Sequence, residues 1–238
     1  MKPTLPATHL LRQYLLFVLT AVFLLTVMRS AYGLWQFPKL EQTSTIINLF
    51  VQGLRFDLAL IGIIALVPVV LGTLLSMSNA TRWLAKFLIT VFLLGGLVLI
   101  LFLELLTPWF LDTQGLRPDI DMLSGVPTPA QTATEVFQQH MIPVIIGLVL
   151  CLLIIIAFWS RMEIGRFLRY RVSVSSALLL ALVGGLICLV AIWSTPDLRK
   201  PALSPGDSLI STDSTVNDLA MNSAYKSLYS LALPYLNR

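Results

Sequence analysis

The sequence predicts an all-α membrane protein, with five transmembrane helices, a short interfacial helix on the outer face and a C-terminal amphipathic linker helix. Hydrophobic residues make up 57% of the 238 positions and charged residues only 12%, whereas a soluble domain carries roughly twice that charged fraction. The mean hydropathy is +0.85. The apolar residues also gather in continuous segments long enough to cross a bilayer, which favours transmembrane helices over a soluble core.

Five segments have the length and the low charge that a membrane-spanning helix needs, roughly 20 residues at a rise of about 1.5 Å per residue. They are Leu10–Leu34, Leu58–Met77, Leu84–Leu106, Ile142–Trp159 and Val172–Trp193. Pro108 follows the third segment, and we expect it to end that helix because proline lacks an amide donor. The paired glycines Gly95-Gly96 and Gly184-Gly185 predict close approach of neighbouring helices.

The distribution of basic residues predicts the orientation of the helices, because cytoplasmic loops are enriched in Lys and Arg. The short loop after the fourth segment holds four arginines and one acid, whereas the long connection Thr107–Met141 holds one arginine, Arg117, and four acids. We therefore expect a cytoplasmic N-terminus and an extracytoplasmic C-terminus, in a bacterial cytoplasmic (inner) membrane. Two domains are expected, a transmembrane domain over residues 1–193 and an extracytoplasmic linker and helix over residues 194–238.

The segments outside the membrane also carry structural signals. The stretch Thr128–Met141, before the fourth apolar segment, has the pattern of a short interfacial helix. After the fifth segment, Ser194–Asp207 is rich in Pro, Ser and Gly and predicts a linker. Helical spacing returns over Ser214–Leu233, with Asp213 or Ser214 as the N-cap. This last helix is amphipathic, so we expect it along the outer membrane surface or against the transmembrane helices.

In this topology, ionisable side chains gather at the outer leaflet, where they are costly unless they are paired, hydrated or functional. The candidate residues are Arg29, Arg55, Asp57, Glu104, Arg117 and, from the C-terminal helix, Asn217, Asn222 and Tyr225. Guanidinium groups beside carboxylates and amides suit the phosphate and the polar headgroup of a phospholipid. The grouping therefore predicts a site that binds a lipid headgroup.

Structural explanations of the same charges remain open. Arg29 and Arg55 can extend from helix ends to the membrane interface, and Asp57 can be favoured by the dipole at the start of the second span. Glu104 can form a purely structural bridge with either arginine. The sequence shows no metal-ligand spacing and no nucleophile triad. The net charge of +4 is that of a membrane protein with basic cytoplasmic loops and does not predict a nucleic-acid partner.

Three motifs resemble the membrane domain of lipoteichoic acid synthase-like proteins, the phosphoglycerol and phosphoethanolamine transferases of the alkaline phosphatase/sulfatase superfamily. They are GLRFD at 53–57, similar to an R-F-D element; ELLTPWF at 104–110 with RPD at 117–119, similar to E-x-x-x-P-x-F…R-P-N; and VNDLAMNSAYKSL at 216–228, similar to V-N-x-L-A-x-N-x-x-Y-S-L. Two departures are Asp119, where the family has Asn, and Lys226, which is inserted before Ser227.

The resemblance implies five helices, a linker helix and then a large extracytoplasmic catalytic domain. The family's threonine nucleophile and its ligands for a divalent metal, such as manganese or magnesium, lie downstream of the linker helix. No catalytic or metal-binding residue is therefore carried over, no cofactor is expected in this chain, and the chain alone is expected to be inactive. Its expected role is to anchor a catalytic domain, in cis or in trans, and to present a membrane phospholipid to it. The alternative is a non-catalytic scaffold or regulator that binds a partner through its C-terminal helix.

Overall fold

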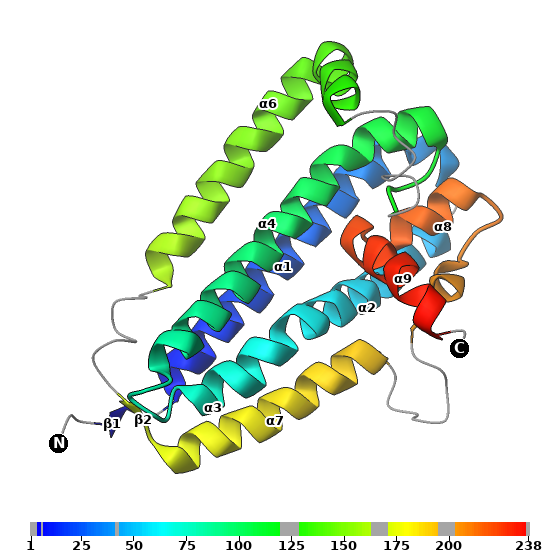
Figure 1. Cartoon of the computed structure of the whole chain (residues 1–238). Coiled ribbons are helices and arrows are strands. Elements are labelled where there is room, and N and C mark those ends of the chain that lie inside the picture. Colours follow the sequence, from blue (N-terminus) through cyan, green and yellow to red (C-terminus); the bar gives the residue numbers. More distant parts are fainter. Residues whose placement is uncertain are drawn as a thin grey trace. The chain divides into compact units, whose positions relative to one another are not determined.

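Helices form almost the whole of the described structure (Figure 1). The computed structural model describes residues 4–5, 7–40, 43–119, 129–162, 171–194 and 203–236. Two strands of two residues each, β1 (Thr4–Leu5) and β2 (Arg171–Val172), pair in parallel. Apart from this short pair, the predicted all-helical architecture is confirmed.

The helical elements follow one another along the chain, and η2 is a π-helical segment that continues α2 into α3. They are α1 (Thr8–Trp35), η1 (Phe37–Lys39), α2 (Thr43–Val67), η2 (Pro68–Gly72), α3 (Thr73–Leu75), α4 (Arg82–Gln114), α6 (Pro129–Arg161), α7 (Val174–Trp193), η4 (Pro205–Ser208), α8 (Ser214–Ala220) and α9 (Ser223–Leu236).

Four helical segments are long and apolar enough to span a membrane. They are Thr8–Trp35, Thr45–Leu75, Arg82–Gln114 and Val174–Trp193. Large apolar side chains on these segments are exposed, such as Leu182 of α7 at 72%. Such wide apolar exposure on a helix is favourable in lipid and unfavourable in water. The chain is therefore a multi-pass membrane protein.

The predicted fourth span lies in α6, which is longer than predicted. Pro129–Met141, most of the predicted interfacial helix, continues without a break into the apolar part of α6, and Thr128 lies outside the described residues. Among the residues described, the apolar part of α6 covers Gly147–Arg161, which is shorter than the four spans. The count of five transmembrane helices therefore stays a prediction.

Two helix boundaries predicted from charge and from proline are wrong. Helix α2 begins at Thr43 rather than at Leu58, so Asp57 lies well inside the helix and is not favoured there by the dipole of the helix start. Helix α4 continues through Pro108. In both places a side chain from α1 compensates for the feature that was expected to interrupt the helix.

Pro108 illustrates this compensation. A proline inside a helix leaves the carbonyl four residues earlier without its amide donor. Here that carbonyl belongs to Glu104, and it accepts a hydrogen bond of 2.5 Å from the hydroxyl of Tyr32 in α1. The buried carbonyl is satisfied, so α4 extends past the proline to its end at Gln114.

The predicted C-terminal helix is divided into α8 and α9. The N-cap prediction is confirmed, since the Asp213 side chain accepts a hydrogen bond of 2.7 Å from the amide of Thr215. Residues Thr215–Tyr225 are all buried. This stretch is therefore packed on every side rather than lying on a surface with one polar face.

The chain divides into two compact units. Unit 1 comprises Met1–Val22, Leu58–Val98 and Ile154–Ala202, and unit 2 comprises Phe23–Asp57, Leu99–Leu153 and Leu203–Arg238. The core of unit 2 is a cluster of apolar side chains from α1, α2, α4, α8 and the chain after η1. Its buried members are Tyr32, Leu40, Leu49, Leu111, Val216, Leu219 and Ala220.

Helices of unit 1 approach one another at glycines. A Cβ atom added to Gly96 would lie 2.5 Å from Cγ2 of Ile64, and one added to Gly184 would lie 2.7 Å from Cγ1 of Val69. Both distances are shorter than van der Waals contact, so these positions have no room for a side chain. The prediction of close packing therefore holds for these glycines but not for Gly95, which has nothing within 4 Å.

Candidate functional site

The first part of the candidate site, which lies in unit 2, is a buried ion pair between α1 and α2. Nη1 and Nη2 of Arg29 each donate to one oxygen of Asp57 at 2.7 Å, and Nη2 also donates to the carbonyl of Gly53 at 3.1 Å. The two side chains are 2% and 0% exposed. Because a single buried charge is very costly, each residue depends on the other for its burial.

Gly53 makes room for this arginine. A Cβ atom at this position would lie 2.2 Å from Nε and 2.3 Å from Cζ of Arg29, far inside van der Waals contact. The guanidinium therefore lies directly against the backbone of α2, one turn before Asp57. The glycine of the GLRFD motif thus has a steric role in forming the ion pair.

The second part is a buried ion pair between α4 and the segment that follows it. Nη1 of Arg117 donates to both oxygens of Glu104, at 2.8 and 2.7 Å, and the side chains are 1% and 2% exposed. The guanidinium also lies 5.2 Å from the ring centre of Tyr32, which is within cation–π range. Burial lowers the pKa of Arg117, but Glu104, Tyr32 and Asp218 together raise it more, so the guanidinium stays charged.

Gly115 forms the turn that brings Arg117 back to Glu104. Its φ angle is 70°, and its amide donates to the carbonyl of Leu111 at 3.1 Å. This is the left-handed conformation that commonly ends helices, and glycine adopts it without a Cβ clash. The turn ends α4 and reverses the chain, so that the arginine lies beside a carboxylate of the helix it has just left.

The N-terminus of α9 joins the two ion pairs. Asn222 caps this helix, because its Oδ1 accepts from the amide of Tyr225 at 2.7 Å, while its Nδ2 donates to Asp57 at 3.0 Å. The amide of Ser223 donates to Glu104 at 3.0 Å. The first amides of a helix lack internal partners and carry partial positive charge, so both carboxylates are stabilised here.

A third ion pair joins α8, α9 and the backbone of Arg117. Nζ of Lys226 lies 3.0 Å from Oδ1 of Asp218 and donates to the carbonyl of Arg117 at 2.8 Å. Asp218 in turn accepts the amide of Arg117. Lys226, the residue inserted into the third motif, therefore takes part in the network. Three carboxylates and three cations balance one another in these pairs.

Arg55 and Tyr225 lie beside this network. Arg55 is half-buried and donates to Oε1 of Gln52 at 2.6 Å. Tyr225 donates from its hydroxyl to the carbonyl of Leu203 at 2.7 Å, and its ring packs edge-on against Phe56 with 5.3 Å between the ring centres. The Phe56–Tyr225 contact is a second link between the first and the third motif.

Asn217 has a local role at the start of α8. Its Oδ1 accepts hydrogen bonds from the amides of Ile210 and Ser211, at 2.8 and 2.7 Å, and its Nδ2 donates back to the carbonyl of Ser211 at 2.8 Å. These bonds close the turn that precedes the helix. The side chain is therefore used in shaping the chain and does not reach the ion pairs.

Five of the eight candidate residues thus meet in one network: Arg29, Asp57, Glu104, Arg117 and Asn222. Glu104 pairs with Arg117 and not with Arg29 or Arg55, the two arginines considered for it, because the turn at Gly115 brings Arg117 close. Sequence reasoning missed Tyr32, Asp218 and Ser223 as members. The Asn222-Ser223 pair inside an expected helix was a usable signal, since asparagine is a preferred N-cap.

No protein-family model matches the chain, and no solved structure gives a significant match. The site is therefore interpreted from its own chemistry. Within the described ranges, no group of three or more His, Cys, Asp or Glu side chains is placed to hold a metal ion. What the network can do is hold α9 in one orientation against α1, α2 and α4, with its charges neutralised in a buried, apolar environment.

Proposed function

We propose that this chain is the membrane domain of a phosphoglycerol- or phosphoethanolamine-type transferase that resembles lipoteichoic acid synthase. In this role it anchors an extracytoplasmic catalytic domain, in cis or in trans, and presents a membrane phospholipid to it as the donor. The proposed location is the bacterial inner membrane, with α6 as the fifth span, the N-terminus in the cytoplasm and the C-terminus outside.

The observation that carries this proposal is that the three motifs of the resemblance contact one another. Asp57 from the first motif, Glu104 from the second and the Asn222-Ser223 pair from the third are joined by hydrogen bonds of 3.0 Å. Buried charges of this kind have few alternative partners, so the linker helix has one favourable docked position. A membrane domain that holds a catalytic domain over its donor lipid requires a linker helix with such a fixed position and direction.

Within this proposal, the buried arginines and Arg55 have different roles. Arg29 and Arg117 are occupied by carboxylates and hold the structure together. Arg55 is only half-buried, so a lipid phosphate can reach its guanidinium without breaking either pair. We therefore assign the contact with the donor headgroup to Arg55, and the positioning of the linker helix to Asp57, Glu104 and Asn222.

The test is the transfer of labelled glycerol phosphate or ethanolamine phosphate from phospholipid to envelope polymers or glycans, in cells of the organism that encodes the protein. Deletion of the gene should abolish one of these transfers, and the wild-type gene should restore it. Arg55→Gln should lower transfer several-fold at unchanged membrane abundance. Arg55→Lys, which keeps the charge, should retain more of the transfer activity than Arg55→Gln. Lys86→Gln, which removes a half-buried cation from α4, is the control. Unchanged transfer after deletion would contradict the proposal.

A second candidate is a non-catalytic scaffold or regulator that binds a partner protein through its C-terminal helix. The closed ion pairs favour it, because the part of unit 2 that the structure describes keeps Arg29 and Arg117 away from any headgroup. This candidate predicts a stable complex after detergent extraction, found by crosslinking from the exposed side of α9. It also predicts normal phosphoglycerol and phosphoethanolamine transfer in the deletion strain, which separates it from the first proposal.

A further inference from the structure

In unit 2, the exposed side chains of α4 change from apolar to polar at Trp109. Phe102, before this tryptophan, is 57% exposed, whereas the exposed residues of α4 after it are Asp112, Thr113 and Gln114. Tryptophan is enriched at the interface between acyl chains and water, where its ring lies at the level of the headgroups. The end of α4 therefore crosses a membrane interface at about Trp109.

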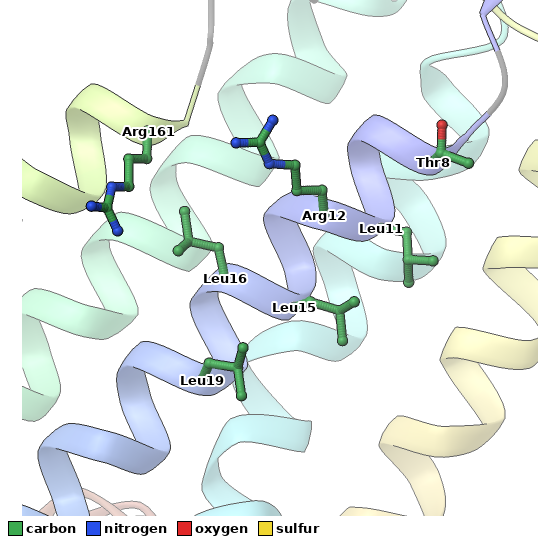
Figure 2. Close-up of a pocket in the computed structure, with 7 residues that line it drawn as sticks. All are labelled: Thr8, Leu11, Arg12, Leu15, Leu16, Leu19 and Arg161. Atoms are coloured by element: carbon green, nitrogen blue, oxygen red, sulfur yellow. The ribbon is translucent and has the colours of Figure 1, made fainter.

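Helix α1 spans the hydrocarbon core and reaches an interface at Trp35. Figure 2 shows its first turns, where the exposed Arg12 is followed by Leu15 and Leu19, which are 50% and 68% exposed. From Arg12 to Trp35 the helix rises about 35 Å at 1.5 Å per residue, slightly more than the roughly 30 Å of a hydrocarbon core. Trp35, the last residue of α1, is 43% exposed and therefore lies at the interface where this helix ends.

The ends of α1 and α4 lie at the same interface, because the hydroxyl of Tyr32 donates to the carbonyl of Glu104. Arg29 lies six residues before Trp35, about 9 Å along α1. Glu104 lies five residues before Trp109, about 7.5 Å along α4. The two helices thus give nearly the same depth for the two ion pairs that contain Arg29 and Glu104. Both pairs lie below the level of the headgroups, where ionisable side chains are paired and face the protein interior.

The corner between α8 and α9 reaches the same depth. Asn222 donates to Asp57 at 3.0 Å, and the amide of Ser223 donates to Glu104 at 3.0 Å. Met221, which separates the two helices, has an extended backbone and is 5% exposed. Non-helical backbone at membrane depth is stable only where protein covers it and supplies partners for its polar groups. This corner is buried and has such partners.

Leu209, on the loop before α8, lies near the depth of the last turn of α1. The next residue, Ile210, packs against the apolar cluster that contains Tyr32, and Tyr32 lies three residues before Trp35. The side chain of Leu209 is 74% exposed, as is that of Leu34 in this last turn. At that depth an exposed side chain meets acyl chains, which favour leucine over polar residues.

We propose that residues 203–225 form a re-entrant segment in the leaflet in which α1 ends, with Leu209 in contact with the acyl chains of its lipids. The α8–α9 corner lies below the phosphates, covered by α1, α2 and α4. Asp207, which is exposed, stays at the level of the headgroups, since two residues of chain reach up to about 7 Å. The partner of this surface is the hydrocarbon of the bilayer. This placement does not depend on the transferase proposal.

The first test is electron paramagnetic resonance of single spin labels in proteoliposomes, in a background without the native cysteines. Power saturation compares the accessibility to oxygen, which concentrates in acyl chains, with that to a water-soluble nickel chelate. The labelled variants are Leu209→Cys, Leu34→Cys at the same expected depth, Val27→Cys two turns deeper in α1 and Gln114→Cys beyond Trp109. We expect the oxygen-to-nickel ratio of Leu209→Cys to match that of Leu34→Cys and to exceed that of Gln114→Cys several-fold.

Three results of this test would overturn the proposal. A ratio for Leu209→Cys equal to that of Gln114→Cys would place the loop in water. Low accessibility to both reagents would mean that protein, such as a second copy of the chain, covers Leu209. A ratio that does not rise from Leu34→Cys to Val27→Cys would show that the end of α1 is not at an interface.

The second test keeps the native cysteines, so it remains valid if the cysteine-free background fails to fold. Leu209→Asp places a carboxylate among acyl chains, which is costly, and should draw the loop toward water. Hydrogen exchange of the α8 amides in proteoliposomes should then rise several-fold. Leu209→Ala, which adds no charge, and Gln114→Asp, which adds a charge on the aqueous side, should leave this exchange near that of the wild type. Equal exchange in Leu209→Asp and Leu209→Ala would contradict contact with lipid.

Discussion

Unit 1 and unit 2 are both built from segments of long apolar helices, but different interactions hold them together. In unit 1, helices approach at glycines such as Gly96 and Gly184, where side chains of Ile64 and Val69 fill the space above the backbone. In unit 2, three ion pairs and the N-terminus of α9 join the helices. The comparison shows that helices of similar hydropathy can pack closely at glycines or be joined by buried ion pairs.

In both units a tyrosine donates to a backbone carbonyl of a proline-containing helix. In unit 1 the hydroxyl of Tyr14 donates to the carbonyl of Pro68 at 2.7 Å, where the helix widens into its π-helical segment. In unit 2 the hydroxyl of Tyr32 donates to the carbonyl that Pro108 leaves without a donor. Both tyrosines belong to α1. An unpaired carbonyl is costly in an apolar environment, so Tyr32 allows α4 to keep Pro108. Tyr14 instead binds the carbonyl of Pro68 itself.

The largest expected effect is in unit 2. Glu104→Ala leaves Arg117 buried without its partner, which should lower the free energy of unfolding by about 3–5 kcal/mol. The measurement is SDS-induced unfolding in mixed micelles, with hydrogen exchange of the α9 amides as a local readout. The double variant Glu104→Met, Arg117→Met removes both charges, so its free energy of unfolding should fall much less. A loss below about 1 kcal/mol for Glu104→Ala, the range of exposed pairs, would show that the pair is not buried.

The matching test in unit 1 compares two adjacent glycines of α4. Gly96→Ala places a methyl group 2.5 Å from Ile64 and should cost about 1–3 kcal/mol through overpacking. Gly95→Ala meets nothing within 4 Å and should be neutral or stabilise the helix by up to about 1 kcal/mol. Equal effects of the two substitutions on unfolding would contradict the glycine packing of unit 1.

A smaller effect is expected at the tyrosines. Tyr32→Phe removes the donor to the Glu104 carbonyl, and Tyr14→Phe removes the donor to the Pro68 carbonyl. Each should cost about 1–2 kcal/mol, since one buried acceptor loses its hydrogen bond. Replacing Pro108 by Ala restores the amide donor within α4, so Tyr32→Phe should cost less in that background. A double-mutant cycle on the unfolding free energy measures this coupling. Additive effects would show that Tyr32 does not compensate for Pro108.

The smallest effect concerns pH. Burial, with Tyr229 and Asp207 nearby, raises the pKa of Tyr225 to about 12. The folded protein therefore favours the neutral phenol, and this contribution is complete below about pH 10 and is lost as the pH rises from about 10 to 12. The thermal midpoint of the wild type should fall over this interval more steeply than that of Tyr225→Phe. Parallel curves for the two proteins would argue against a buried phenol.

Hydropathy predicted the bounds of the membrane-spanning helices well in two spans that contain no proline and no carboxylate. The first segment, Leu10–Leu34, differs from Thr8–Trp35 by two residues at its start and one at its end, and the last, Val172–Trp193, begins two residues before the observed helix. Prediction of the second segment stopped at Asp57, because an unpaired carboxylate does not fit inside a span. The structure removes that objection by pairing Asp57 with Arg29.

The members of the network were largely predictable, but their pairing was not. Charges at the ends of apolar segments are rare and costly, which is why Arg29, Asp57, Glu104 and Arg117 stood out in the sequence. Which carboxylate meets which arginine depends on the turn at Gly115 and on the space at Gly53. These are effects of backbone conformation and of close approach, and spacing along the chain does not reveal them.

The sequence by itself determined that the chain crosses a membrane and that its costly charges belong to a few positions, because hydropathy and charge are properties of each residue and add up along a segment. Only the tertiary structure decided that α4 continues through Pro108, that Thr215–Tyr225 is buried and that the amide of Ser223 meets Glu104. That last contact joins residues 119 positions apart. Its energy depends on how close the fold brings the two groups, which local properties of the sequence do not determine.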